Sequence, residues 1–199
     1  MPTISCESYT FSFRVGFPVE AGRTIAMKTL YLLRHAKSSR SDETLEDHDR
    51  PLSKRGRRAA EAIADHLARS HAKFDLVLSS TSLRTHETVQ PIVARLKPRR
   101  VVFDRDLYLA PGTSLLDRLR RIEESVDTVL LVAHNPGLHG LALSLAAPDS
   151  SARLPPLTGK FPTGALACFR FKGPWRKLAS ESATAVSFVA PADLEVERA

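Results

Sequence analysis

The sequence has few cysteines and no long apolar segment. Its two cysteines among 199 residues, Cys6 and Cys168, stand far apart and in no C-x-x-C pair. Neither a disulfide framework nor a zinc knuckle is therefore indicated, and we expect two reduced thiols. No stretch approaches the roughly twenty consecutive apolar residues that cross a bilayer, and the first residues lack the basic-then-apolar order of a signal peptide. These absences predict a soluble, cytoplasmic protein with no membrane partner.

The common motifs for nucleotides and catalytic zinc are missing as well. There is no Walker A pattern and no G-x-G-x-x-G, so a nucleotide held by a glycine-rich loop is not indicated. An H-E-x-x-H helix is also absent. We therefore predict that the protein uses no metal and no cofactor.

Positive charge is in excess. The chain carries 29 Lys and Arg against 22 Asp and Glu, a formal net charge of +7, which favours an anionic partner. A nucleic-acid binder would gather its basic residues with exposed aromatics or on a recognition helix, whereas here they are spread along the chain. We expect a solvated basic surface with a few functional arginines and no nucleic-acid partner.

A regular pattern begins at Met27. Residues 1–26 show no sustained periodicity and are rich in Ser, Thr and Gly. We interpret residues 1–26 as an N-terminal extension, either loose or an artefact of start-codon choice, and residues 27–199 as a single domain.

Within that domain, short apolar runs alternate with amphipathic helices. Strands are predicted at residues 29–33, 74–78, 101–103, 128–132, 165–171 and 185–189. Helices are predicted around residues 60–67, 85–96, 115–122 and 138–145. The fourth run is nearly all apolar, as in a central parallel strand, whereas the last two alternate and are expected to finish the sheet near its edge. The order predicts an α/β fold, a three-layer α/β/α sandwich with a mostly parallel central sheet.

Residues whose side chains can bind a ligand or take part in catalysis follow three of these strands. In open α/β sheets, ligands bind beyond the carboxyl ends of the strands. The ends of the first, second and fourth strands hold or adjoin two arginines and two histidines: Arg34, His35, Arg84 and His134. A lone histidine is usually structural or exposed, a class to which we assign His66, His71, His86 and His139. Two histidines at equivalent strand ends instead favour a catalytic pair.

These residue types favour an anion over a metal ion. The strand ends carry no acidic cluster, and arginines would repel a cation. Arginine presents a planar fork of donors that matches phosphate oxygens, and it stays charged at physiological pH. We therefore predict a phosphate site held by side chains.

Four motifs, in this order, resemble those of the histidine phosphatase, or phosphoglycerate mutase-like, superfamily. Residues 32–38 (LLRHAKS) are similar to its R-H-x-x-S signature, and residues 52–56 (LSKRG) to its L-S-x-x-G helix start. Residues 79–85 (SSTSLRT) resemble its S-S-x-x-x-R segment, and residues 132–135 (VAHN) its second-histidine turn. The R-H-A-K-S wording and residues 160–165 (KFPTGA) most resemble the SixA-type phosphohistidine phosphatases.

The resemblance implies a phosphoglycerate mutase-like fold and a mechanism. His35 would be the nucleophile, forming a covalent phosphohistidine that water then hydrolyses. The other catalytic residues implied are Arg34, Arg84 and His134, which would hold the phosphate oxygens. The substrate-binding residues implied are Ser38, Ser41 and Asn135. The nearby arginines should lower the pKa of His35, so that it attacks as a neutral imidazole.

The sequence departs from the pattern of many superfamily members in two ways. By counting from the nucleophile, Lys37 and Ser41 stand where many members carry glutamate and asparagine, which disfavours sugar-phosphate mutase activity. No general acid stands out either. The candidates are Asp42, Asp47, His48, Asp49 and Tyr108, the first four in a long charged loop at residues 39–51.

The lack of an obvious general acid favours a phosphohistidine substrate. A phosphohistidine has a leaving imidazole that is easily protonated, so it needs less help than an alkyl phosphate ester. We predict a metal-independent phosphatase that removes phosphate from phosphohistidine on a protein, such as a histidine phosphotransfer domain. Two alternatives stay open: a phosphatase of small phosphate esters, which needs a general acid, and an inactive module that holds a phosphorylated partner.

Overall fold

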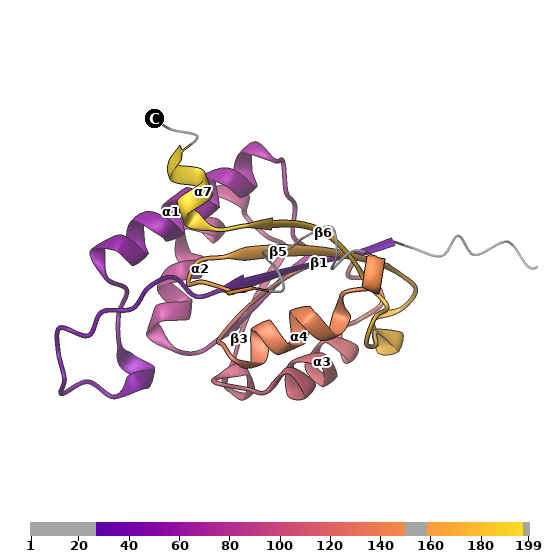
Figure 1. Ribbon diagram of the computed structural model, residues 1–199, viewed down its shortest axis with the longest axis horizontal. Helices are drawn as coiled ribbons and strands as arrows, with labels where there is room; N and C mark the ends of the chain where they lie inside the picture. The colour runs from indigo at the N-terminus through magenta and orange to yellow at the C-terminus, as the bar shows by residue number, and fades with distance from the viewer. Residues whose placement is uncertain (1–26, 150–158, 197–199) are drawn as a thin grey trace, which may run out of the picture.

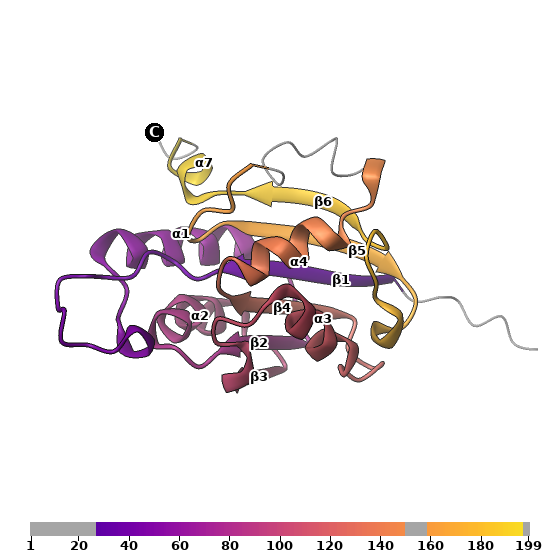
Figure 2. The ribbon, with the colours of Figure 1, turned by 60° about the horizontal axis from the view of Figure 1, so that its bottom comes forward.

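The computed structural model describes residues 27–149 and 159–196; the predicted N-terminal extension, residues 1–26, lies outside them. The strands are β1 (Met27–Arg34), β2 (Leu76–Ser80), β3 (Arg100–Asp104), β4 (Thr128–Ala133), β5 (Leu166–Lys172) and β6 (Thr184–Val189). They form one sheet in the order β3-β2-β4-β1-β5-β6 (Figures 1 and 2). The first four in this order are parallel, whereas β5 and β6 pair antiparallel. The last two predicted strands therefore finish the sheet, with β6 at its edge.

Helices cover both faces of the sheet. The α-helices are α1 (Lys54–Arg69), α2 (Leu83–Leu96), α3 (Gly112–Arg120), α4 (Gly137–Leu145) and α7 (Pro191–Val196). The described residues also include short 3-10 helices: η1 (Asp47–Asp49), η2 (Arg105–Leu107) and η3 (Trp175–Lys177). In Figure 1, α1, α2 and α7 lie on one side of the sheet and α3 and α4 on the other. No helix in the described ranges is long and apolar enough to cross a membrane.

The central strand β4 shows why the apolar runs are continuous. Its Val129 and Leu131 belong to the core that includes α3 and α4, whereas Leu130 and Val132 belong to the core that includes α1 and α2. Successive side chains of a strand point to opposite faces, so a strand covered on both faces must be apolar throughout. The predicted three-layer α/β/α sandwich is confirmed.

Some predicted boundaries are wrong by one to three residues. Phe74 was expected to begin the second strand but precedes β2, because the chain there is tied at Asp75, whose carboxylate accepts hydrogen bonds from the backbone of Asp127 and Thr128. Ile122 lies beyond the end of α3. The short helix α7 was not predicted, since six residues give too little periodicity to detect.

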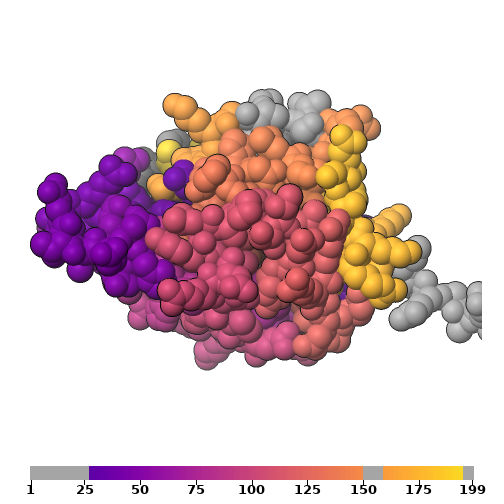
Figure 3. All heavy atoms as spheres, turned by 90° about the horizontal axis from the view of Figure 1, so that it is seen from below, coloured from indigo at the N-terminus to yellow at the C-terminus, as the bar shows by residue number. Residues whose placement is uncertain are grey.

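The functional end of the molecule is marked by the loop at residues 39–51. The parallel strands run toward this end, and the loop projects there in Figures 1 and 2. In the space-filling view of Figure 3 the α3–α4 layer forms a broad face, beside which the indigo atoms of this early part of the domain protrude. The carboxyl ends of β1, β2 and β4 therefore open beside this loop.

Candidate active site

The four predicted catalytic residues lie together where β1, β2 and β4 end. His35 directly follows β1 and His134 directly follows β4; the preceding residues, Arg34 and Ala133, are paired in the parallel register. The two imidazole rings consequently lie 5.0 Å apart between centroids. Arg84 comes from the first turn of α2, and its Nη2 lies 3.5 Å from His134 Nδ1.

His35 is a buried histidine whose tautomer is set by the backbone. Its side chain is only 7% exposed, and its Nδ1 lies 2.8 Å from the carbonyl oxygen of Ala36. A carbonyl only accepts, so Nδ1 carries the proton and donates, which leaves the lone pair on Nε2. Burial lowers the pKa of His35 to about 4, and the charges of Arg84 and Arg34 add to this. The arginines act in the predicted direction, but burial is the larger cause.

His134 is held between a serine and an arginine. It is 2% exposed, its Nε2 lies 2.9 Å from Ser80 Oγ, and its Nδ1 faces Arg84. A guanidinium only donates, so Nδ1 accepts and Nε2 donates to the serine. Burial, followed by the nearby His35 and Arg84, lowers the pKa of His134 to about 3. The sequence indicated Ser80 only as part of the S-S-x-x-x-R motif, and its contact with the histidine was not predicted.

Arg34 is anchored by the segment that contains Phe161. Arg34 Nη1 donates to the Phe161 carbonyl at 2.8 Å, and Asn135 Nδ2 donates to the same oxygen at 3.0 Å. Arg34 Nε and Asn135 Oδ1 are buried without a hydrogen-bond partner. Burial lowers the pKa of Arg34 from its ordinary value. The predicted substrate-binding residue Asn135 thus lies beside Arg34 and lines the same cleft.

Arg84 is paired with a carboxylate from the loop. It donates to the Asp47 carbonyl oxygen and, through Nη2, to Asp47 Oδ2 at 2.8 Å. The Tyr108 hydroxyl donates to the same Oδ2 at 2.7 Å. Tyr108 first, then Arg84 and Arg50, lower the pKa of Asp47 to about 2, against an opposing effect of burial. Asp47 is therefore ionised at neutral pH, and a phosphate that binds Arg84 must share the guanidinium with Asp47 or replace it.

The other predicted substrate-binding residues differ in their positions. Ser38 lines the cleft, and its Oγ accepts a hydrogen bond from Arg50 Nη2 at 3.3 Å. Ser41 is exposed, and its hydroxyl lies 2.8 Å from the Ser39 hydroxyl. Ser41 is absent from the cleft lining, so the structure does not bring it to the other site residues.

The remaining candidate acids lie outside the cleft lining. Asp42 accepts hydrogen bonds from the backbone and hydroxyl of Thr44, which lower its pKa. His48 lies 2.9 Å from Asp49 through Nδ1 and 3.0 Å from the Thr81 hydroxyl through Nε2. These contacts give each group a local partner away from His35. The loop at residues 39–51 is joined to Arg84 through Asp47.

Close backbone contacts are made at Gly56, in the second motif, and at Gly137, two residues beyond the fourth motif. A Cβ on Gly56 would lie 2.1 Å from the Lys37 carbonyl oxygen, and one on Gly137 would lie 1.8 Å from the Ala110 carbonyl oxygen. Such distances are far below van der Waals contact, so both positions require glycine. Gly137 thereby lets the chain that carries Tyr108 pack against the His134 turn.

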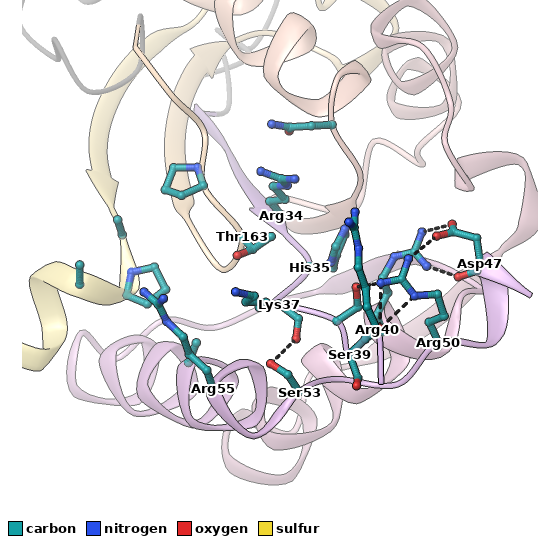
Figure 4. Close-up of a pocket in the computed structure, with 18 of the residues that line it drawn as sticks. Arg34, His35, Lys37, Ser39, Arg40, Asp47, Arg50, Ser53, Arg55 and Thr163 are labelled. Carbon is teal, nitrogen blue, oxygen red and sulfur yellow. Dashed lines mark hydrogen bonds and ion pairs between the residues drawn. The ribbon is translucent and has the colours of Figure 1, made fainter. Parts of the chain in front are cut away.

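Arg34, His35 and Arg84 border an open cleft of about 990 Å³ (Figure 4). Its lining includes Arg34, Lys37, Arg40, Arg50, Arg55 and Arg84. The one carboxylate in the lining, as far as the described residues go, belongs to Asp47. Among those residues there is also no group of three or more His, Cys, Asp or Glu able to hold a metal ion. The excess of cations suits an anionic ligand. Lys37, Arg40, Arg50 and Arg55 were missed as site residues; their only signal was the density of basic residues around the first two motifs.

The chain is similar in sequence and fold to several known proteins. Residues 30–108 match the model of the histidine phosphatase superfamily, branch 1. An uncharacterized protein of Mycobacterium tuberculosis is 34% identical over 162 residues, which cover 80% of this chain and 99% of that protein. An uncharacterized protein of Mycobacterium leprae is 32% identical over 166 residues, again 80% of this chain and 99% of the relative.

Two solved structures are similar over most of the chain. One, provisionally named phosphohistidine phosphatase SixA from Agrobacterium tumefaciens, is 31% identical with a TM-score of 0.70, covering 82% of this chain and 98% of that one. The other, a provisionally named SixA from Nakamurella multipartitia, is 27% identical with a TM-score of 0.73, covering 83% of this chain and 97% of that one.

Proposed function

Because the chain belongs to the histidine phosphatase superfamily, branch 1, we propose that it is a phosphatase that transfers a phosphoryl group to His35 and then to water. The observation that carries this proposal is the state of His35, a buried neutral imidazole with a free Nε2 beside two arginines and a second histidine. A neutral imidazole is a nucleophile, and arginine forks stabilise the charge on a transferring phosphoryl group.

In the first step, His35 Nε2 attacks phosphorus while the bond to the leaving group breaks. The proton stays bonded to Nδ1, which donates it in a hydrogen bond to the Ala36 carbonyl oxygen; this hydrogen bond stabilises the positive charge that develops on the ring. Arg34 and Arg84 hold the equatorial oxygens. In the second step, water attacks phosphorus, the bond to Nε2 breaks, and inorganic phosphate leaves with His35 restored.

His134 contributes a further donor to the transferring phosphate. In the free protein its Nδ1 accepts from Arg84, so donation to phosphate requires the other tautomer. The Ser80 hydroxyl can either accept from Nε2 or donate to it, so it serves both tautomers without moving. Ser80 thus allows His134 to change its role when phosphate binds.

The proposed substrate is phosphohistidine on a protein. An alkyl ester needs a general acid for its leaving oxygen, but Asp47, the carboxyl in the described cleft lining, is held ionised by Tyr108 and Arg84. A leaving imidazole is basic enough to take its proton from water. The names given to the two similar SixA structures support the same substrate class.

Rapid-quench mass spectrometry tests this function. The protein is mixed with a phosphorylated histidine phosphotransfer domain and quenched without acid. We expect a phosphate adduct on His35 with loss of phosphate from the partner, no adduct in His35→Ala, and a normal adduct in His71→Ala, which removes an exposed histidine. Phosphate loss at the normal rate with His35→Ala would overturn the mechanism.

Small phosphate esters are the second candidate substrates, because the cleft is large enough to hold a whole small molecule. Phosphoserine and the phosphorylated domain are compared at equal concentration. Labelling of His35 by the ester alone would keep the phosphatase and reject the phosphohistidine substrate. Labelling by neither would instead favour the inactive binding module.

A further inference from the structure

On the side of His35 away from Asp47, the cleft contains a pair of cations that the reaction does not use. Lys37 and Arg55 are exposed side chains that line it, and Figure 4 shows both reaching into it on the side of His35 away from Asp47. Within the described part of the chain, neither forms an ion pair with a carboxylate. Arg50 and Arg84, on the other side, are both paired with Asp47.

The two cations belong to one rigid unit. The Lys37 carbonyl oxygen accepts from Ser53 N at 2.9 Å and from Ser53 Oγ at 3.0 Å. Gly56 packs on the same carbonyl, where a Cβ would lie at 2.1 Å. Arg55 stands between these two contacts in the first turn of α1. The backbones that carry Lys37 and Arg55 are therefore held together, and their like charges repel each other unless an anion lies between them.

The neighbouring lining adds a hydroxyl but no negative charge. Thr163 lies on the same side of His35 in Figure 4. The lining also includes its chain neighbour Pro162 and two residues that lie beside Gly164, Pro191 and Ala59. None of these side chains neutralises the two cations. An anionic ligand at this side of the cleft would therefore meet two cations with no competing carboxylate in the lining there.

We propose that Lys37 and Arg55 form a second anion-binding subsite, which binds carboxylate side chains next to the phosphohistidine of a protein substrate. This inference rests on the proposed function. Both cations are exposed at the mouth of the cleft, where a side chain on a partner's surface reaches them while its phosphohistidine lies at His35. The subsite thus selects a phosphohistidine flanked by Asp or Glu over one flanked by neutral residues.

Two synthetic phosphohistidine peptides test the subsite; they differ only in having Glu or Gln on both sides of the phosphohistidine. For the unmodified protein at low salt we expect kcat/KM to be roughly tenfold higher for the Glu peptide, equivalent to about 1.4 kcal/mol. The preference should vanish in the double variant Lys37→Ala/Arg55→Ala. It should persist in Arg58→Ala/Lys73→Ala, which removes the same charges from exposed positions outside the cleft.

The outcomes separate the subsite from the proposed function. Equal rates on both peptides, or a preference that survives the Lys37→Ala/Arg55→Ala change, would overturn the subsite. The subsite would also be overturned if Lys37→Ala/Arg55→Ala lost as much activity toward phosphoramidate as toward the Glu peptide, because phosphoramidate has no second anionic group. If neither peptide is turned over, the proposed function fails. Binding of both peptides to His35→Ala, measured by fluorescence polarization, then decides the subsite on its own: a Glu preference supports it and equal affinities reject it.

Discussion

The protonation of His35 gives the sharpest quantitative prediction. Burial and the two arginines lower its pKa to about 4, whereas a histidine in an unfolded chain has a pKa of about 6.5. At pH 5, about 90% of a group with the lower pKa is neutral, against about 3% of a group with the ordinary value. The nucleophile should therefore remain about thirty times more available at pH 5 than an unperturbed histidine.

Two measurements check this value. The carbon-13 shift of the His35 ring, assigned by its loss in His35→Gln, should stay constant from pH 8 to pH 5 and change near pH 4. In single-turnover reactions, the rate of phosphoenzyme formation should not fall with a midpoint at about pH 6.5 as the pH is lowered, as it would if His35 had the ordinary pKa of histidine. Arg84→Met should raise the pKa of His35 by only part of the difference between about 4 and the ordinary value of about 6.5, because burial is the larger cause of the shift.

The same shift links stability to pH. The unfolded chain takes up a proton on this residue below about pH 6.5, whereas the folded protein does so only below about pH 4. The folded state therefore loses stability as the pH falls through this interval, by about 3 kcal/mol for His35 alone. A ring that titrates near pH 6.5 in the folded protein would refute the reasoning, since it would mean that water reaches the imidazole freely.

Three substitutions give further predictions. Arg84→Ala should lower kcat by a factor on the order of 10² to 10³ with an unchanged circular dichroism spectrum, because one preorganised phosphate donor is lost; a kcat within a few-fold of normal would contradict this. Ser80→Ala should cost about 1 to 3 kcal/mol in urea unfolding, because it leaves the buried Nε2 of His134 without its hydrogen-bond partner, while Ser41→Ala, at an exposed position, should cost almost nothing. Gly56→Ala should destabilise the protein by more than about 1 kcal/mol, because its Cβ would overlap the Lys37 carbonyl; an unchanged unfolding midpoint would show that this contact is looser than described.

The fold was predictable because the pattern of apolar residues along a strand indicates whether one or both of its faces are buried. The continuous apolar run at residues 128–132 indicated a strand covered on both faces, which β4 is. The alternating runs near the C-terminus likewise indicated two strands that finish the sheet; their antiparallel pairing was not predicted. The end of α3 was not predictable, since Ile122 continues the helical spacing although the helix stops at Arg120.

The site was predictable only where the sheet alone determines position. The carboxyl ends of parallel strands lie at the same edge of a sheet, so the convergence of the two histidines followed from their positions directly after two such strands. The contact of Asp47 with Arg84 depends on how a long loop folds back, a matter of tertiary packing that local pattern does not encode. For the same reason Asp47 was weighed as an acid, although its partners hold it as a carboxylate.

The spacing of the two histidines has a consequence for how the protein tolerates change. Arg34 and Ala133 are register partners in adjacent parallel strands, and His35 N donates to the Ala133 carbonyl oxygen at 3.2 Å. Neighbouring strands lie about 4.8 Å apart in any sheet. The separation of the imidazoles is thus a property of the backbone in the centre of the core, the part of a protein that opens least often. Sequence changes and motions in the surrounding loops can alter which substrates reach the cleft while the distance between the two rings stays fixed.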